Sequence, residues 1–234
     1  KFLFREELTL ENTEKYLHEN MLDVIALGFN PKKTHFLIDT IHANLMYKQA
    51  VRVAKKITFS TVKSSFGFTN ETNIGAIFYT AMQAVPAFLP SVLAKKNIPC
   101  LIPLGADQDS HFRLTRDVID KLGYYKPSIL HCRFLPSLQG SGKMSVTDFT
   151  NYVIYTTDTE KEVESKIKKY AFSGGRDTLE EQRRKGGNPD IDISYQYLRM
   201  LLERDDKKLK ETYNNYKSGA LLSSELKQIL IEKL

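Results

Sequence analysis

The sequence has few cysteines and no long apolar run. Cys100 and Cys132 are the two cysteines among 234 residues, and each lies in a short apolar segment. Their spacing fits neither a zinc site nor a disulfide framework, so we expect a reducing compartment and a cytoplasmic location. The longest apolar segments are interrupted by Pro86, Pro90 or charged residues, so the sequence shows no run of membrane length and no signal-peptide pattern. We therefore expect no membrane partner.

Internal repeats and low-complexity segments are also lacking, while apolar residues make up 41% of the chain, enough to form a core. Lysine and arginine number 34 against 28 acidic residues, and the pI is about 9.1. This balance fits a polyanionic partner such as nucleic acid, and equally a soluble protein with a mildly basic surface. The chain begins with Lys1 rather than Met, so we expect a fragment whose upstream part is missing.

Helical patterns dominate the first hundred residues. Thr9 is placed to cap a helix over 10–27, and Thr58 to cap a short helix ending at Gly67. THFLID (34–39) has the composition of a strand. The remaining expected helices are 44–55 and the apolar segment 74–95, which we expect to break at Pro86 and Pro90.

A strand–turn–helix–strand pattern follows. IPCLIPL (98–104) predicts a buried strand, GADQ (105–108) a turn, and SILHCRF (128–134) a second strand. Asp109 is placed to cap the helix between them, over 110–122. Such a unit predicts parallel strands with a right-handed crossover, and ligands bind beyond the carboxyl ends of parallel strands. GADQ and the segment after the second strand are therefore expected at one sheet edge.

Strand patterns disappear after Tyr155, and charged helical sequence follows. We expect a first domain over 1–154, with parallel strands and a helical insertion, and an all-helical domain over 155–234. The helices expected in the second domain are one capped by Thr157 or Asp158 and running to Tyr170, then 193–203, 206–217 and 223–234.

The stretch QGSGKMSVT (139–147) suggests a phosphate-binding loop. It lacks the G-x-x-x-x-G-K-[ST] pattern, because Met144 follows Gly142-Lys143 and Ser137 occupies the first glycine position. No G-x-G-x-x-G follows any expected strand either. Two glycines, a lysine and hydroxyl side chains still suit an anion, with Met144 as an apolar anchor. The alternative is a flexible surface loop with an incidental lysine.

Three segments together resemble a known family. KMSVT (143–147) resembles the KMSKS signature of class I aminoacyl-tRNA synthetases, and GADQ (105–108) resembles the GxDQ signature of the tyrosyl and tryptophanyl branch. AFSGGRDTLEEQRRKGGN (171–188) resembles a segment of eukaryotic and archaeal tryptophanyl-tRNA synthetases. The resemblance covers nearly the whole chain. It implies an α/β fold: the C-terminal part of a Rossmann-like class I catalytic domain, followed by a helical anticodon-binding domain.

The sequence departs from the family pattern at two places. The HxGH signature is absent, and the segment His42-Ala43-Asn44-Leu45 does not replace it. In KMSVT, Val146 replaces the usual second lysine and Thr147 the last serine, although Thr147 keeps a hydroxyl.

The resemblance implies an enzyme that activates tryptophan with ATP and Mg²⁺ and transfers it to its tRNA. Lys143 and Ser145 would be the catalytic residues at the leaving pyrophosphate. Gln83 and Gln108 would contact the amino acid. The residues implied in ATP binding are Gly105, Asp107, Lys143, Met144, Ser145 and Thr147.

Alternatives remain open at this stage. A non-catalytic synthetase-like protein that binds nucleotide or RNA is favoured by the missing HxGH, and a tyrosyl-tRNA synthetase shares GxDQ and KMSxS. His111 and Asp117 are interpreted as structural. Arg176 and the basic run 183–185 either contact tRNA phosphates or form a solvated face. By resemblance we expect a homodimer involving the 74–95 region.

Overall fold

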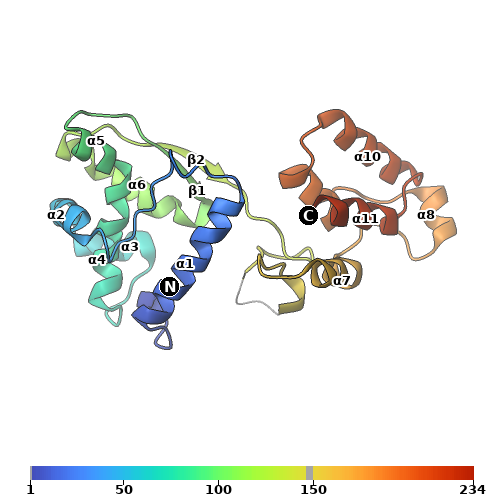
Figure 1. Cartoon of the computed structure of the whole chain (residues 1–234), viewed down its shortest axis with the longest axis horizontal. Helices are drawn as coiled ribbons and strands as arrows, with labels where there is room; N and C mark the ends of the chain where they lie inside the picture. Colours follow the sequence, from blue (N-terminus) through green and yellow to red (C-terminus); the bar gives the residue numbers. More distant parts are fainter. Residues whose placement is uncertain (1, 146–149) are drawn as a thin grey trace. The chain divides into compact units, whose positions relative to one another are not determined.

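The computed structural model describes residues 2–145 and 150–234, which form two compact units (Figure 1). The first extends to Arg133 and the second runs from Phe134 to Leu234. This division lies earlier than the domain boundary expected between residues 154 and 155. The reason is visible at Leu138, whose side chain is fully buried in the core of the second unit.

A parallel two-stranded sheet lies in the first unit, as the strand–helix–strand pattern predicted. Strand β1 pairs with β2 in a register from Leu101 opposite Ser128 to Gly105 opposite Cys132. Gly105 and Cys132 therefore mark one sheet edge, where the GADQ turn begins. The elements of this unit are α1 (Leu10–Ala26), α2 (Ala43–Ala54), α3 (Phe59–Phe66), α4 (Ile74–Ala84), α5 (Leu89–Ala94), β1 (Leu101–Gly105), α6 (Asp109–Val118) and β2 (Ser128–Cys132).

The core of the first unit forms where α2 and α4 pack together and continue into the proline-containing segment. Pro86 and Pro90 break the apolar stretch as expected, leaving a 3-10 turn over Val85–Ala87 and then the short helix α5. Phe88 is 1% exposed and stacks on Tyr124, with ring centroids 4.9 Å apart. Much of the apolar 74–95 segment is therefore buried within its own unit.

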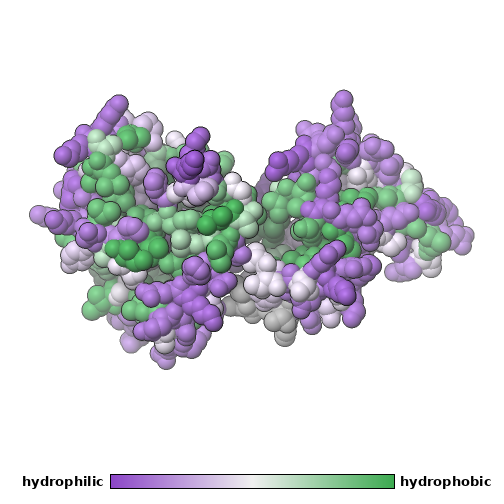
Figure 2. Space-filling view, viewed as in Figure 1, coloured by the Kyte–Doolittle hydropathy of each residue, from purple (hydrophilic) through white to green (hydrophobic). Residues whose placement is uncertain are grey.

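Several local predictions for the first unit were wrong. Residues 34–39 form no strand, because they make no ladder with another part of the described chain. Asp109 is the first residue of α6 rather than its cap, and α6 ends at Val118. The strands are not buried as expected: Leu101 is 60% and Leu130 is 54% exposed. Figure 2 shows apolar side chains reaching the surface of this unit.

The second unit is helical, as predicted. Thr159, rather than Thr157 or Asp158, caps α7, and it forms a reciprocal capping box with Glu162. Asp158 instead accepts a 2.5 Å hydrogen bond from Lys166 Nζ. The helices of this unit are α7 (Glu160–Tyr170), α8 (Leu179–Lys185), α9 (Ile193–Tyr197), continued by a π-helical turn over Leu198–Leu202, α10 (Asp206–Ser218) and α11 (Ser223–Lys233).

Glycines allow the segment 172–188 to pack directly on neighbouring backbone. A Cβ added at Gly174 would lie 2.0 Å from the Asn188 carbonyl oxygen, and one at Gly186 would lie 1.8 Å from that of Lys217. Gly186 also has φ +69°, in the left-handed region. Close packing against neighbouring main chain is therefore what requires glycine at these two positions.

Asp192 joins the segment 172–188 to α9 and α10 through hydrogen bonds to its carboxylate. Its carboxylate is 1% exposed and accepts bonds from the Gly174 N–H at 2.9 Å and from the Tyr216 hydroxyl at 2.8 Å. It also caps α9 through the N–H groups of Ser194 and Tyr195. Burial, followed by the nearby Asp192 carboxylate, raises the pKa of Tyr216 to about 12. The Tyr216 phenol is therefore a hydrogen-bond donor throughout the neutral range.

Across the described residues, no helix combines the length and apolarity needed to cross a membrane.

Candidate functional site

Two glutamines meet in the first unit. Gln83 lies in the last turn of α4, and Gln108 ends the 3-10 turn Ala106–Gln108 that follows β1. The Gln83 amide nitrogen donates to the Gln108 side-chain oxygen at 2.7 Å, and both side chains are half-buried. Residues 25 positions apart are thus joined at the carboxyl end of a parallel strand. This is the pair to which the sequence assigned the amino-acid substrate.

The GADQ turn presents its carboxylate outward. Gly105 is the last residue of β1 and is half-buried, whereas Asp107 is exposed. An exposed carboxylate at a sheet edge is suitable for accepting bonds from vicinal hydroxyl groups of a ligand. Gly105, at the end of β1, is thus followed directly by the 3-10 turn that carries Asp107 and Gln108.

A charged cluster beside this turn was missed in the sequence. His131, on β2, is bonded through Nε2 to an Asp109 carboxylate oxygen at 2.6 Å, and Arg113 pairs with the other oxygen. The His131 hydrogen bond, more than the Arg113 charge, holds the pKa of Asp109 below its usual range. The i,i+4 spacing of Asp109 and Arg113 was the available signal, but the partnership with His131 depends on the strand register.

His111 packs as the structural interpretation expected. Its ring lies 4.3 Å from the Phe66 ring and 6.5 Å from that of Tyr79, between centroids. Burial lowers the pKa of His111, so the imidazole is neutral at pH 7. Its Nδ1 is buried without a hydrogen-bond partner among the described residues. His111 therefore contributes mainly ring contacts.

The lysine loop lies in the second unit and is shaped by its glycines. Gly140 and Gly142 have φ of +82° and +70°, which permits a tight return of the chain. The Ser137 hydroxyl donates to the Ser141 carbonyl at 2.8 Å, and Lys143 forms an isolated antiparallel bridge with Pro136. The loop therefore has a defined backbone up to Lys143.

At the end of this loop, Lys143 contacts an aromatic ring and Met144 packs against the core of the second unit. Lys143 Nζ lies 4.8 Å from the centre of the Phe134 ring, a cation–π contact. Met144 is half-buried against the core of the unit, as expected of an anchor, and its N–H donates to Leu135. Ser145 is half-buried. Thr147, predicted for ATP, lies outside the described residues.

A pocket of about 430 Å³ adjoins Lys143. Its lining includes Ser137, Ser145 and Tyr152, together with the lysine itself. The Ser137 hydroxyl donates to Ser141, so Ser145 and Tyr152 are the hydroxyl residues that, with the lysine, suit a phosphate group.

The basic residues Arg176 and 183–185, for which nucleic-acid contact and a solvated face both remained open, have mixed surroundings. Arg176 Nε donates to the Gly186 carbonyl at 3.1 Å, and Arg183 donates to the Gly219 carbonyl at 3.0 Å. Lys185 pairs with Glu181 at 2.8 Å. Arg176 and Arg183 therefore stabilise the fold through backbone carbonyls, while Arg184 is exposed.

Within the described ranges, no group of three His, Cys, Asp or Glu side chains is arranged to hold a metal ion.

Known proteins match this chain along its full length. It is 50% identical to the tryptophan–tRNA ligase of Sulfurisphaera tokodaii and 47% identical to the cytoplasmic tryptophan–tRNA ligase of Saccharomyces cerevisiae. Each alignment covers 100% of this chain, but 60% and 55% of the respective relative. The chain therefore spans somewhat more than half the length of these curated relatives.

Solved structures that resemble this chain also include tryptophanyl-tRNA synthetases. The crystal structure of Plasmodium falciparum tryptophanyl-tRNA synthetase is similar with a TM-score of 0.90 and 44% identity, covering 99% of this chain and 62% of that one. The synthetase from Encephalitozoon cuniculi bound to tryptophan has a TM-score of 0.89 at 33% identity, covering 100% of this chain and 62% of that one. A family model described as class I tRNA synthetases (W and Y) matches residues 5–234. The chain belongs to the class I tRNA synthetases of the tryptophan and tyrosine type.

Proposed function

We propose that this chain is part of a tryptophan–tRNA ligase, which joins tryptophan to ATP and then transfers the aminoacyl group to its tRNA. The observation that carries the proposal is the 2.7 Å bond between Gln83 and Gln108 at the end of β1. Amides both donate and accept, so the pair matches the ammonium and carboxylate groups of an amino acid.

In the activation step the tryptophan carboxylate attacks the α-phosphorus of ATP. A new P–O bond forms as the bond to pyrophosphate breaks, and negative charge increases on the leaving oxygens. Lys143 and Ser145 stabilise that charge, and Thr147 adds a hydroxyl. Asp107 accepts from the ribose hydroxyls while Gly105 lets the nucleotide lie against backbone.

Further assignments extend the proposal. Residues 155–234 serve as the anticodon-binding domain, while residues 1–154 form the catalytic part. The protein acts as a cytoplasmic homodimer, and Mg²⁺ accompanies ATP. The cytoplasmic yeast relative supports the location.

ATP–pyrophosphate exchange tests this reading in the full-length natural protein. We expect exchange dependent on tryptophan and not on tyrosine. Exchange with tyrosine alone would favour the tyrosyl alternative, and no exchange with either would favour a non-catalytic binding protein. The 234-residue chain, which lacks an HxGH signature, is expected to show little or no exchange.

Lys143→Ala in the full-length protein tests the catalytic assignment. Loss of one preorganised donor to a developing charge slows such reactions by about 10²–10³-fold. We expect kcat for exchange to fall by that order while the Kd for tryptophan changes by less than about threefold. Lys143→Arg, which keeps the charge, is the matched control. Equal losses in kcat and tryptophan affinity would argue against a transition-state role.

A further inference from the structure

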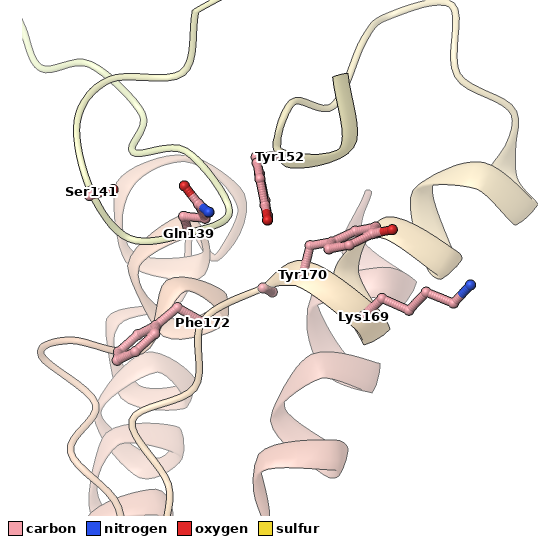
Figure 3. A pocket seen from close by; sticks show the side chains of 7 residues that line it. Gln139, Ser141, Tyr152, Lys169, Tyr170 and Phe172 are labelled. Atoms are coloured by element: carbon pink, nitrogen blue, oxygen red, sulfur yellow. The ribbon is translucent and has the colours of Figure 1, made fainter. Parts of the chain in front are cut away.

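A larger pocket lies in the second unit beside the lysine loop. It has a volume of about 530 Å³ and is open to solvent (Figure 3). It shares part of its wall with the Lys143 pocket but extends to the end of α7. The residues that line it are Gln139, Ser141, Tyr152, Lys169, Tyr170, Ala171 and Phe172. A volume of this size accommodates a single nucleotide.

Aromatic rings form one wall of this pocket. Tyr152 and Tyr170 are both half-buried, with ring centroids 5.4 Å apart and planes at 80°. Such an edge-to-face pair leaves a ring face uncovered by its partner. Figure 3 shows the Tyr152 ring projecting between Gln139 and Tyr170. The uncovered aromatic surface is suited to a flat, stacked ligand group.

The charge at the pocket rim is positive and unpaired. Lys166 pairs with Asp158, and Lys168 pairs with Glu164. Lys169 is exposed and has no ion-pair partner within residues 2–145 and 150–234. None of the described lining residues carries a carboxylate. An anionic group at the rim would therefore meet one available cation without acidic side chains beside it.

Gln139 supplies the hydrogen-bonding edge. Its side chain is exposed on the loop that precedes Lys143 and is directed toward Tyr152 in Figure 3. An amide donates and accepts at once, which matches the N6/N7 edge of adenine. Stacking surface, amide edge and cation thus line one pocket, with Lys169 beyond Tyr170 on the side away from Gln139 (Figure 3).

We propose that this pocket binds an adenine nucleotide, with the base on the Tyr152–Tyr170 pair and the phosphate at Lys169. The nucleotide is either free or an unpaired residue of bound RNA. The RNA source rests on the proposed function, because a ligase acting on tRNA must contact it; the free-nucleotide source does not.

Binding of three probes distinguishes these sources: AMP by equilibrium dialysis, and fluorescein-labelled hexaadenylate and a tRNA transcript by anisotropy. Tyr170→Ala is expected to weaken binding about tenfold or more, whereas Tyr170→Phe keeps the ring and stays within about twofold. Lys169→Gln is expected to weaken the RNA probes several-fold and to reduce their log–log salt slope by about 0.7. Far-UV circular dichroism and the urea midpoint verify that each variant is folded.

Lys161→Gln is the matched control. Lys161 is exposed near the start of α7, the helix that also carries Lys169, and its replacement by glutamine removes the same single positive charge. If the Tyr170→Ala and Lys169→Gln substitutions weaken the binding of AMP alone, the pocket is assigned to free nucleotide. If they weaken the binding of the RNA probes, it is assigned to RNA. Unchanged affinity of all probes for Tyr170→Ala, or equal effects of Lys161→Gln and Lys169→Gln, overturns the proposal. Pyrophosphate exchange by the unmodified full-length protein tests the proposed function separately.

Discussion

Replacing Asp192 by alanine should destabilise the second unit more than the loss of a helix cap alone. Caps contribute about 1 kcal/mol. Asp192→Ala removes the cap of α9 and also leaves the buried Gly174 N–H without its acceptor, at a cost of about 1–3 kcal/mol. The Tyr216 hydroxyl keeps its hydrogen bond with the Ser223 hydroxyl at 2.9 Å, so the loss of its bond to Asp192 adds little to the destabilisation. We expect a total loss of about 3 kcal/mol in the free energy of unfolding.

Asp205→Ala provides the control for this prediction. Asp205 caps α10 through the N–H groups of Lys207 and Lys208, but it is exposed and makes no bond to the 172–188 segment. Its removal should cost about 1 kcal/mol, the value of the cap. The difference of about 2 kcal/mol between the two variants isolates the tertiary bonds.

Urea unfolding followed by far-UV circular dichroism gives both free energies. Hydrogen exchange of amides in 172–195, measured by mass spectrometry in the intact chain, reports the same loss locally. Asp192→Asn, which keeps the shape and part of the accepting capacity, should fall between wild type and alanine. If Asp192→Ala and Asp205→Ala cost the same within about 0.5 kcal/mol, the reasoning about the buried bonds is refuted.

Two further predictions concern the same chain. The free energy of unfolding should decline as pH rises from 10 toward 12, because the unfolded chain releases the Tyr216 proton first while the folded-state pKa is raised to about 12. Tyr216→Phe should remove that part of the decline in pH-dependent urea titrations, and an identical pH profile in the variant would contradict the assignment. In a double-mutant cycle of Gln83→Ala and Gln108→Ala, unfolding free energies should reveal a coupling of about 1 kcal/mol, from the 2.7 Å bond. Additive effects within about 0.3 kcal/mol would indicate that the amides do not pair in solution.

Local signals predicted much of the helical structure. The caps at Thr9 and Thr58 each accept a bond from the backbone N–H three residues on, as their positions suggested. Gly67 ends α3 with φ +67°. These features depend on residues within one turn of each other, so a single sequence contains the required information.

Features that depend on distant residues were less predictable. Asp109 has the sequence position of a cap, but His131 and Arg113 take its carboxylate, and the His131 contact follows from strand register. Gln83 and Gln108 were each assigned to the amino-acid substrate through resemblance, but the hydrogen bond between them was not predicted, because it joins residues 25 positions apart. The strand expected at 34–39 required a neighbouring strand, which its apolar residues cannot specify.

The tight packing at Gly174 and Gly186 changes how the AFSGGRDTLEEQRRKGGN segment (171–188) should be interpreted. With carbonyl oxygens of Asn188 and Lys217 within 2.0 Å of where a side chain would begin, even alanine is excluded unless the backbone moves. A deep mutational scan would therefore find these positions intolerant whatever the chemistry of the replacement. In this segment, glycine is required at two positions of the family signature because two stretches of main chain pack closely there, and not because of contact with a substrate.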